Sequence, residues 1–399
     1  MYIRHSMTSL VIPGFRAVLG VVLACACLSS AAASVDSQPA PPPAPGNVEW
    51  LLPASPPVRA QTEEEKKLGQ AVGRTLPGPE ILQPTLDPAL RPYSPTPGLK
   101  IDRHFRAGCS DVLPGLVEAW IAAFRRHFPG FTLELDRPLA GSLGARELIG
   151  GRVDMVFVSR ELKPQDIADF RNTFGYDPLS VPVSGGSYRH FGFLDALAFM
   201  VHRDNPIERL SLQQLDAILS TTRHRGGPAV RTWGDLGLTG EWAERPIHVY
   251  GIKPWNGFEE FIRQRVLNAE GRRGEWREDM HFDGTFFPIA RRVAADPAGL
   301  GYTGMSVVDS AVKVIQVGTE DGTAFVAPTY EAVATAEYPL SRLVYLNTNR
   351  PPGQPLDPAV REFLRFILSA EGQAEVARHA VFLPLRATQV KSSLPLIGE

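Results

Sequence analysis

Residues 140–162 read AGSLGARELIGGRVDMVFVSREL, and this stretch decides the fold class. A Gly/Ser turn at 141–142 opens a short helical pattern, and a glycine turn at 150–151 then leads into a mostly apolar run at 153–158. Such a run is typical of a parallel strand that is covered on both faces. Strand and helix patterns that alternate in this way predict an α/β protein with doubly wound sheets.

The same stretch carries groups that suit an anion. Gly141 and Ser142 precede a predicted helix, whose N-terminus leaves backbone N–H groups unpaired and has a partial positive charge. Ser159 and Arg160 end the predicted strand with a hydroxyl and a fixed cation. Taken alone, the stretch fits an ordinary strand–helix turn with a surface arginine equally well.

The α/β pattern continues on both sides, from about residue 99 onward. Trp120, Phe124 and Phe128 recur at i, i+4 and i+8, which predicts one apolar helix face. Ser211 and Asp357 stand at the expected N-caps of two further helices. The other predicted strands include 131–135, 181–183, 197–201, 247–250 and 343–346. A body of about 300 residues commonly forms two lobes.

Residues 1–33 have the composition of a secretory signal. Arg4 and Arg16 are its formal charges, its apolar core at 18–28 is too short for a permanent membrane span, and small residues follow at 31–33. Removal of the two arginines takes the formal net charge from −2 to about −4. No strongly basic field remains, so we expect no nucleic-acid partner.

Two processing hypotheses follow from this segment. Cleavage after Ala33 predicts a soluble exported protein. Alternatively, VLAC at 22–25 resembles a lipobox and predicts Cys25 as a lipidated residue that tethers the chain to a membrane. Beyond residue 33 the chain has a single cysteine, Cys109, so we expect no internal disulfide and a fold that depends on its hydrophobic core.

Residues 34–98 differ from the rest of the chain. PAPPPAP at 39–45 is typical of a polyproline tether, and prolines recur through Pro97. No core-forming pattern is visible in this region. We therefore expect a Pro-rich, largely disordered linker that acts as a spacer between the membrane or wall and the domain.

Two patterns that suggest an enzyme are set aside. GLGYTG at 299–304 matches a dinucleotide fingerprint, but that motif needs a strand before it and a helix after it, and the predicted order here is reversed. Ser187, His190 and Asp195 have triad residue types but fall within one short segment, whereas triad members usually come from distant segments. The sequence also lacks H-E-x-x-H, cysteine-pair and G-x-S-x-G motifs. We expect no catalysis, cofactor or metal.

Several segments resemble, in one collinear order, the phosphate-binding proteins of ABC transporters. CSDVL at 109–113, followed by Trp120, is similar to the Gly-Ser-Asp-Thr-Leu…Trp opening of that family. The further segments that resemble the family are 141–162, 195–215, 232–237, 297–302 and 363–385. The resemblance covers about residues 100–388.

That resemblance implies a two-lobed periplasmic-binding-protein-like fold, with doubly wound sheets joined by a two-segment hinge. It implies lobe I at 99–204 and 306–399 and lobe II at 205–305, with the ligand in the cleft between them. The ligand-binding residues that it implies are Ser110, Asp111, Gly141, Ser142, Ser159 and Arg160 in lobe I, and Lys253, Asn256 and Gly257 in lobe II. Asp111 would accept the proton of monoprotonated phosphate and repel sulfate, although the residue by itself suits a helix N-cap equally well.

The lobe II loop, YGIKPWNGF at 250–258, departs from the family pattern. Asn256 and Phe258 stand where the family has Ser and Thr, and Lys253 stands near an expected Arg but lacks its fork. In lobe I, Val112 replaces a Thr. A charge-assisted contact is worth about 1.5–3 kcal/mol, so the loss of two would weaken binding by about a hundredfold or more.

Two functions from different classes fit these observations. The first is an exported solute-binding protein, a monomer, that captures phosphate or a related oxyanion for an ABC permease. The second is an envelope or surface interaction module with weak or no phosphate binding, which the altered loop and the long Pro-rich tether favour. Both predict a periplasmic or otherwise extracytoplasmic protein.

Overall fold

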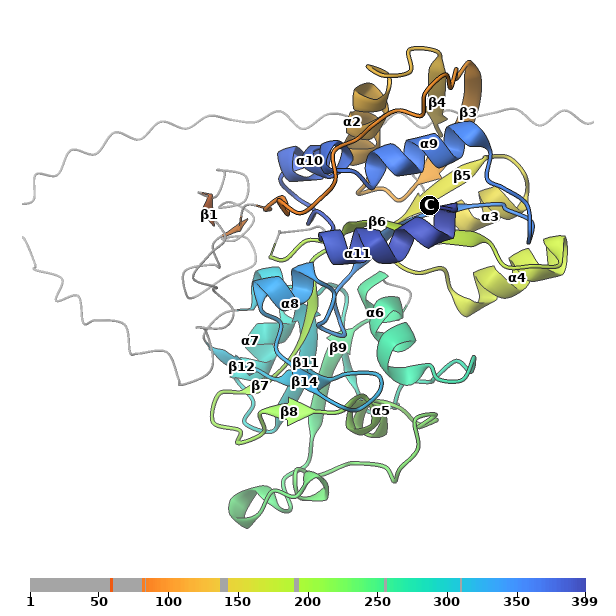
Figure 1. Cartoon of the computed structure of the whole chain (residues 1–399). Helices are drawn as coiled ribbons and strands as arrows, with labels where there is room; N and C mark the ends of the chain where they lie inside the picture. Colours follow the sequence, from red (N-terminus) through yellow and green to blue (C-terminus); the bar gives the residue numbers. More distant parts are fainter. Residues whose placement is uncertain are drawn as a thin grey trace, which may run out of the picture. The chain divides into compact units, whose positions relative to one another are not determined.

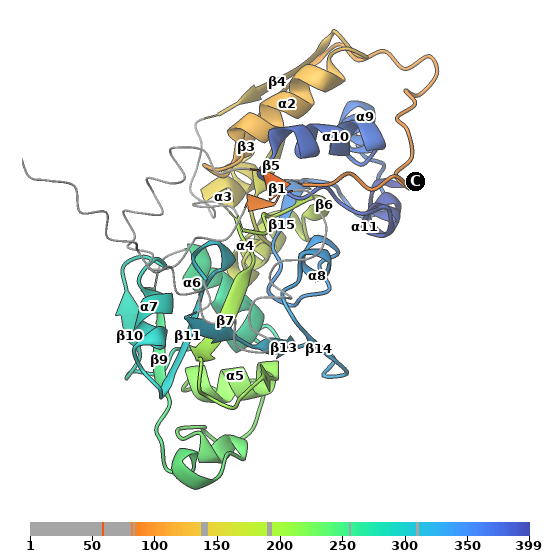
Figure 2. The same cartoon turned by 90° about the vertical axis from the view of Figure 1, so that its left-hand side faces the viewer.

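The computed structural model describes residues 84–136, 143–189, 194–254, 257–308 and 311–399, together with two short paired strands, β1 (Val58–Arg59) and β2 (Ile81–Leu82). These residues fall within one unit, 43–399, which contains two large sheets. Figures 1 and 2 show the helices that accompany each sheet. In the part of the chain that is described, no helix has both the length and the apolarity needed to cross a membrane.

The first sheet has the strand order β4-β3-β5-β15-β6. Its strands are β3 (Arg103–Cys109), β4 (Phe131–Leu135), β5 (Met155–Val158), β6 (Leu179–Gly185) and β15 (Leu343–Thr348). The strand β3 pairs in parallel with β4 and β5, whereas β15 runs antiparallel to β5 and β6. Helices cover this sheet: α2 (Pro114–Phe124), α3 (Leu143–Ile149), α4 (Pro164–Phe174), α9 (Pro358–Ile367), α10 (Ala370–His379) and α11 (Ala387–Ser393).

The strand β5 shows how the sheet is covered on both faces. Met155 and Phe157 belong to the hydrophobic cluster formed with α2 and α9, whereas Val156 and Val158 belong to a separate cluster formed with α3 and α4. Successive side chains of a strand point to opposite faces, so an apolar residue at every position is needed here. The expected α/β fold with a doubly wound sheet is confirmed.

The second sheet has the strand order β10-β9-β11-β7-β12. Its strands are β7 (Leu197–His202), β9 (His248–Ile252), β10 (His281–Asp283), β11 (Gly299–Gly304) and β12 (Val312–Val314). A smaller sheet contains β8 (Arg209–Leu210), β13 (Gln316–Gly318) and β14 (Phe325–Val326). The helices are α5 (Leu212–Leu219), α6 (Gly257–Ile262), the π-helical η3 (Arg263–Leu267) that continues it, α7 (Ile289–Ala294) and α8 (Tyr330–Ala334).

The strand pairing changes the expected lobe boundaries. The strand β7 lies before residue 205, and β12 lies after residue 305, yet both belong to the second sheet. One hydrophobic cluster joins that sheet to β13 and α8. The boundaries at 204/205 and 305/306 therefore differ from the structure, because long-range strand pairing, and not the local pattern, decides which sheet a strand joins. Below, lobe I and lobe II denote the groups around the first and second sheets.

Two chain segments cross between the lobes side by side. The Gly186 backbone N–H donates to the Arg342 carbonyl at 2.7 Å, and the Leu197 N–H donates to the Leu340 carbonyl at 3.2 Å. A Cβ on Gly186 would lie 2.4 Å from the Leu194 carbonyl oxygen and 2.9 Å from the Arg342 Cβ, so the close approach needs glycine. This pair of segments is the double crossover that a two-lobed fold requires.

Residues 84–98 differ from the linker expected at 34–98. Leu90 is buried in the lobe I cluster. The Tyr93 hydroxyl donates to Glu362 at 2.7 Å, and the Thr96 hydroxyl donates to the same carboxylate at 2.7 Å. Single contact residues such as these show no helix or strand periodicity, and prolines surround them. The sequence pattern therefore did not indicate that this segment packs on the domain. We call residues 84–98 the N-terminal strap.

Two helix caps and one glycine motif show how local sequence shapes the described elements. The Ser211 hydroxyl caps α5 by accepting from the Gln214 N–H, and the Asp357 carboxylate caps α9, so both predicted caps are confirmed. The glycine motif at 299–304 is the strand β11 itself, so it opens no helix. A Cβ on Gly301 would lie 2.7 Å from Val293 of α7, so this glycine serves helix–strand packing.

Candidate functional site

The polar groups of lobe I meet where two parallel strands end. Ser110 directly follows β3, and Ser159 directly follows the neighbouring β5. The Ser110 N–H donates to the Phe157 carbonyl at 2.9 Å, and the Ser159 N–H donates to Ser110 Oγ at 3.3 Å. Both serines are buried. Because carboxyl ends of parallel strands lie at one sheet edge, two distant sequence motifs form one cluster here.

Arg160 brings a buried cation to this edge. Only 4% of the residue is exposed, and its Nη1 donates to the Glu161 carbonyl at 3.1 Å. Among the described residues, no carboxylate lies within ion-pair distance of its guanidinium. Burial lowers the pKa of Arg160, while the more distant charges of Asp166, Glu260 and Glu161 act in the opposite direction. Arg160 is therefore not the surface arginine of an ordinary strand–helix turn, which was the alternative interpretation of this stretch.

Asp111 lies in the exposed turn that follows Ser110. The N-cap of α2 is Leu113, without a side-chain cap, so the N-cap role considered for Asp111 is wrong. Gly141 and Ser142, which precede α3, lie outside the described residues.

The described part of the lobe II loop presents exposed groups. Lys253 follows β9 and is exposed, and its backbone N–H donates to the Asp283 carbonyl at 2.8 Å. Gly257 begins α6 and is also exposed. Asn256 lies outside the described residues, as do His190 of the discarded triad and Cys25.

Sequence reasoning missed Arg342, which directly precedes β15 in the second crossover. It is 4% exposed. Its guanidinium carbon lies 5.1 Å from the Phe258 ring centroid and 4.9 Å from that of Phe261, both on α6. Burial lowers the pKa of Arg342 to about 10, so the side chain stays charged near neutral pH. The residue joins the lobes, and no local pattern around it signals this.

A second interlobe contact centres on Glu161. Its carboxylate accepts a hydrogen bond from the Tyr345 hydroxyl at 2.8 Å and forms an ion pair with Arg265 of η3. Tyr345 belongs to β15 of lobe I, whereas Arg265 belongs to lobe II. Glu161 therefore ties the lobe I sheet edge to the helix that continues from the lobe II loop.

Asp195 is a fully buried carboxylic acid in the first crossover. Its Oδ2 accepts from the Ser306 N–H at 2.9 Å. Burial raises the pKa of Asp195 to about 7, although the hydrogen bonds from Ser306 and the charge of Arg342 act in the opposite direction. Its described partner is thus the 3-10 turn Met305–Val307 that follows β11, which fits a structural role at the crossover.

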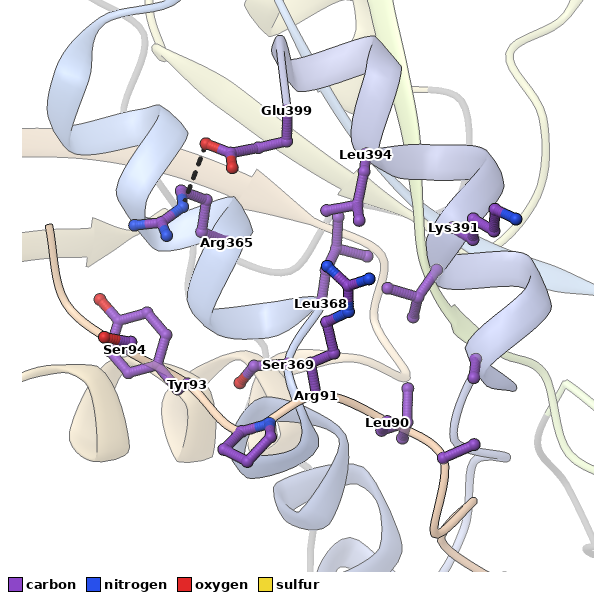
Figure 3. Close-up of a pocket in the computed structure, with 14 residues that line it drawn as sticks. Leu90, Arg91, Tyr93, Ser94, Arg365, Leu368, Ser369, Lys391, Leu394 and Glu399 are labelled. Carbon is purple, nitrogen blue, oxygen red and sulfur yellow. Dashed lines mark ion pairs between the residues drawn. The ribbon is translucent and has the colours of Figure 1, made fainter.

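A separate cavity of about 380 Å³ lies between the strap and helices α9 and α11 (Figure 3). Arg365 lines it and is held by Glu362 and Glu399. Arg91 and Lys391 also line it and are exposed. None of the described ligand-binding candidates lines this cavity.

The comparisons with known proteins agree with this architecture. The family model described as a PBP superfamily domain matches residues 82–371. The phosphate-binding protein PstS of Pseudomonas aeruginosa is 32% identical over 315 residues, which cover 78% of this chain and 92% of that protein. The chain belongs to the phosphate-binding protein family of the PBP superfamily. The expectation drawn from the collinear segments is confirmed.

More distant relatives extend the family. The phosphate-binding protein PstS of Staphylococcus saprophyticus is 24% identical and covers 64% of this chain and 74% of that protein. The crystal structure of PstS from Borrelia burgdorferi is similar with a TM-score of 0.51 and 17% identity, and covers 71% of this chain and 100% of that chain. This likeness supports the two-lobed family fold.

Proposed function

We propose that this chain is an exported solute-binding protein that captures phosphate between its lobes and delivers it to an ABC permease. The observation that carries the proposal is the buried cluster of Ser110, Ser159 and Arg160 at one sheet edge. A buried cation without a carboxylate partner is favourable only where an anion compensates it. The relatives named phosphate-binding proteins support phosphate as that anion.

The proposed roles follow from the chemistry of each group. Ser110 and Ser159 donate hydroxyl hydrogens, and Arg160 supplies the charge. Gly141 and Ser142 offer backbone N–H groups. From lobe II, we assign Lys253, Asn256 and Gly257 to the opposite side of the ligand.

Asp111 is the proposed acceptor for the proton of monoprotonated phosphate. Sulfate carries no proton at neutral pH, so it would leave the carboxylate facing an oxygen of like charge. This arrangement predicts a preference for phosphate over sulfate.

The test is a calorimetric titration of the full chain with phosphate and, in parallel, with sulfate at neutral pH. We expect heat of binding with phosphate, and thermal stabilisation of about 2.7 kcal/mol at a hundredfold excess over Kd. Asp111→Asn should reduce the phosphate/sulfate preference about tenfold, with Asp136→Asn as a control in the same lobe. Absence of heat and of stabilisation up to millimolar phosphate overturns the proposal and favours the interaction module.

We also propose export through residues 1–33, with Cys25 as the lipidation site if the lipobox is used. Labelling of cells with a fatty acid should then mark the wild-type chain and not Cys25→Ser. A chain that is released without label supports cleavage after Ala33 instead.

A further inference from the structure

We propose that Arg342 binds the oxyanion from the second crossover and supplies the guanidinium that the lobe II loop lacks. The inference rests on the proposed phosphate function and names a residue to which neither the family pattern nor the lobe II loop points. It depends on four features of Arg342: its burial, its missing partners, the charges around it and its support by aromatic rings.

Arg342 is unusual among the buried arginines. Arg263 is equally buried, and its Nε donates to Glu259 at 2.8 Å while its Nη1 lies 3.1 Å from Glu275. Arg277 is bound by both oxygens of Asp279. Among the described residues, by contrast, no hydrogen bond or ion pair engages the Arg342 side chain, and its buried Nε has no partner. Buried polar groups are normally satisfied, so these donors are available to a ligand.

The charges around Arg342 favour an anion. The charged groups that shift its pKa most are Asp195, Arg160, Glu161 and Arg265. Glu161 is already engaged by Arg265 and by Tyr345. Burial shifts the pKa of Asp195 to about 7, so its negative charge is incomplete at neutral pH. Beyond the effect of burial, the positive charge of Arg160 lowers the pKa of Arg342, and an anion bound near both buried cations would relieve this repulsion.

The position of Arg342 brings it to the proposed site. It stands three residues before Tyr345, which pairs with Val158, and Val158 directly precedes Ser159. On the other side, its guanidinium lies against Phe258, which directly follows Gly257, the first residue of α6. The residue thus lies between the lobe I strand end and the beginning of α6.

The rings of Phe258 and Phe261 hold the guanidinium in place through cation–π contacts. A guanidinium fixed in this way presents its N–H fork with little further loss of conformational freedom, and the fork matches two oxygens of a tetrahedral anion. This gives a physical reason for Phe258 at a position where the family has Thr. In this proposal, the Phe258 ring holds the Arg342 cation in place, whereas a Thr at this position would contact the anion through its hydroxyl.

The test compares phosphate Kd values of the full chain by calorimetry for wild type, Arg342→Gln and Arg342→Lys. Arg171→Gln, which removes an exposed arginine paired with Asp177, is the matched control. We expect Arg342→Gln to weaken binding about 10- to 100-fold and Arg342→Lys to recover part of the loss, because lysine keeps the charge without the fork. Without phosphate, the melting temperature of Arg342→Gln should stay within about 2 °C of wild type. The substitution removes a buried charge that has no ion-pair partner, so no stabilising pair is broken.

The outcomes separate the two proposals. If wild type binds phosphate and Arg342→Gln binds it equally well, the role of Arg342 is overturned and the proposed function stands. If wild type does not bind, both are overturned. If Arg342→Gln fails to fold, Arg342→Lys decides: a folded variant with at least about fivefold weaker binding supports the inference, and unchanged binding overturns it.

Discussion

The two sides that meet between the lobes use different chemistry. On lobe I, Ser110, Ser159 and Arg160 are buried polar groups fixed at the ends of adjacent strands. On lobe II, α6 presents Phe258 to Arg342, and no described arginine of the loop itself takes part. Under the proposal, the lobe I half of the site keeps its buried polar groups, whereas the lobe II half has an aromatic ring that supports a cation from the crossover in place of a hydroxyl contact.

Arg160→Gln should cause the largest loss of phosphate affinity and tests whether lobe I dominates binding. Phosphate affinity is expected to fall by about a hundredfold or more, because a charge-assisted contact in a buried site is lost. Calorimetry gives the Kd, and Arg152→Gln, which breaks an exposed ion pair with Glu147 in the same lobe, is the control. An affinity within threefold of wild type would show that lobe I does not dominate binding.

The next effect concerns the pH dependence of stability at the crossover. The pKa of Asp195 is raised to about 7, whereas an unfolded Asp titrates near 3.9. Between these values the folded state binds the extra proton, so the contribution of Asp195 to stability falls as pH rises and is lowest above pH 7. Relative to Asp195→Asn, wild type should lose about 2–3 kcal/mol of unfolding free energy between pH 5 and pH 8.

Chemical denaturation at the two pH values measures this difference, with the exposed Asp177→Asn as control. A wild-type curve parallel to that of Asp195→Asn would mean that this carboxylate is ionised throughout. The crossover would then hold an anion of its own beside Arg342, which would weaken the case for a phosphate there.

A smaller effect is expected from Phe258→Thr, which restores the residue type of the family. Phosphate binding should weaken about fivefold, because the cation–π support of Arg342 is worth about 1 kcal/mol. Phe325→Thr removes a ring that lies 4.9 Å from another arginine, Arg209, and is the matched control. Tighter binding by Phe258→Thr would contradict the comparison, since it would mean that the missing hydroxyl matters more than the ring.

The smallest effect should come from the Glu161–Arg265 pair, which joins the two halves. Glu161→Gln and Arg265→Gln should each weaken phosphate binding about two- to threefold, because partly exposed ion pairs contribute little. The double variant should be no weaker than the more affected single one. Fully additive losses in this cycle would show that the two residues act independently and do not connect the lobes.

Much of the fold could be predicted from local sequence. The caps at Ser211 and Asp357 depend on short-range spacing, and the structure confirms them. All three aromatic residues of the predicted helix face are buried, but α2 ends at Phe124, so Phe128 lies beyond the helix. The sheet membership of β7 and β12 could not be predicted in this way. Each pairs with residues far along the chain, and a strand pattern does not specify its partner.

As with the fold, only the part of the candidate site that local motifs mark could be predicted. The motifs named Ser110, Ser159 and Arg160, and the structure brings these three to one edge. Arg342 could not be found, because a single arginine beside a strand has no distinctive pattern. Its burial and its missing partners exist only once the lobes and crossovers have packed.

By itself, the sequence determined the α/β class, the family and the polar groups at the ends of β3 and β5, because each depends on neighbouring residues or on collinear motifs. Only the tertiary structure decided where the lobes divide, that the strap at 84–98 belongs to the domain, and that Arg342 lies between Phe258 and the Ser159 strand end. The physical reason is that burial and charge compensation are properties of contacts between distant segments, and local patterning does not encode them.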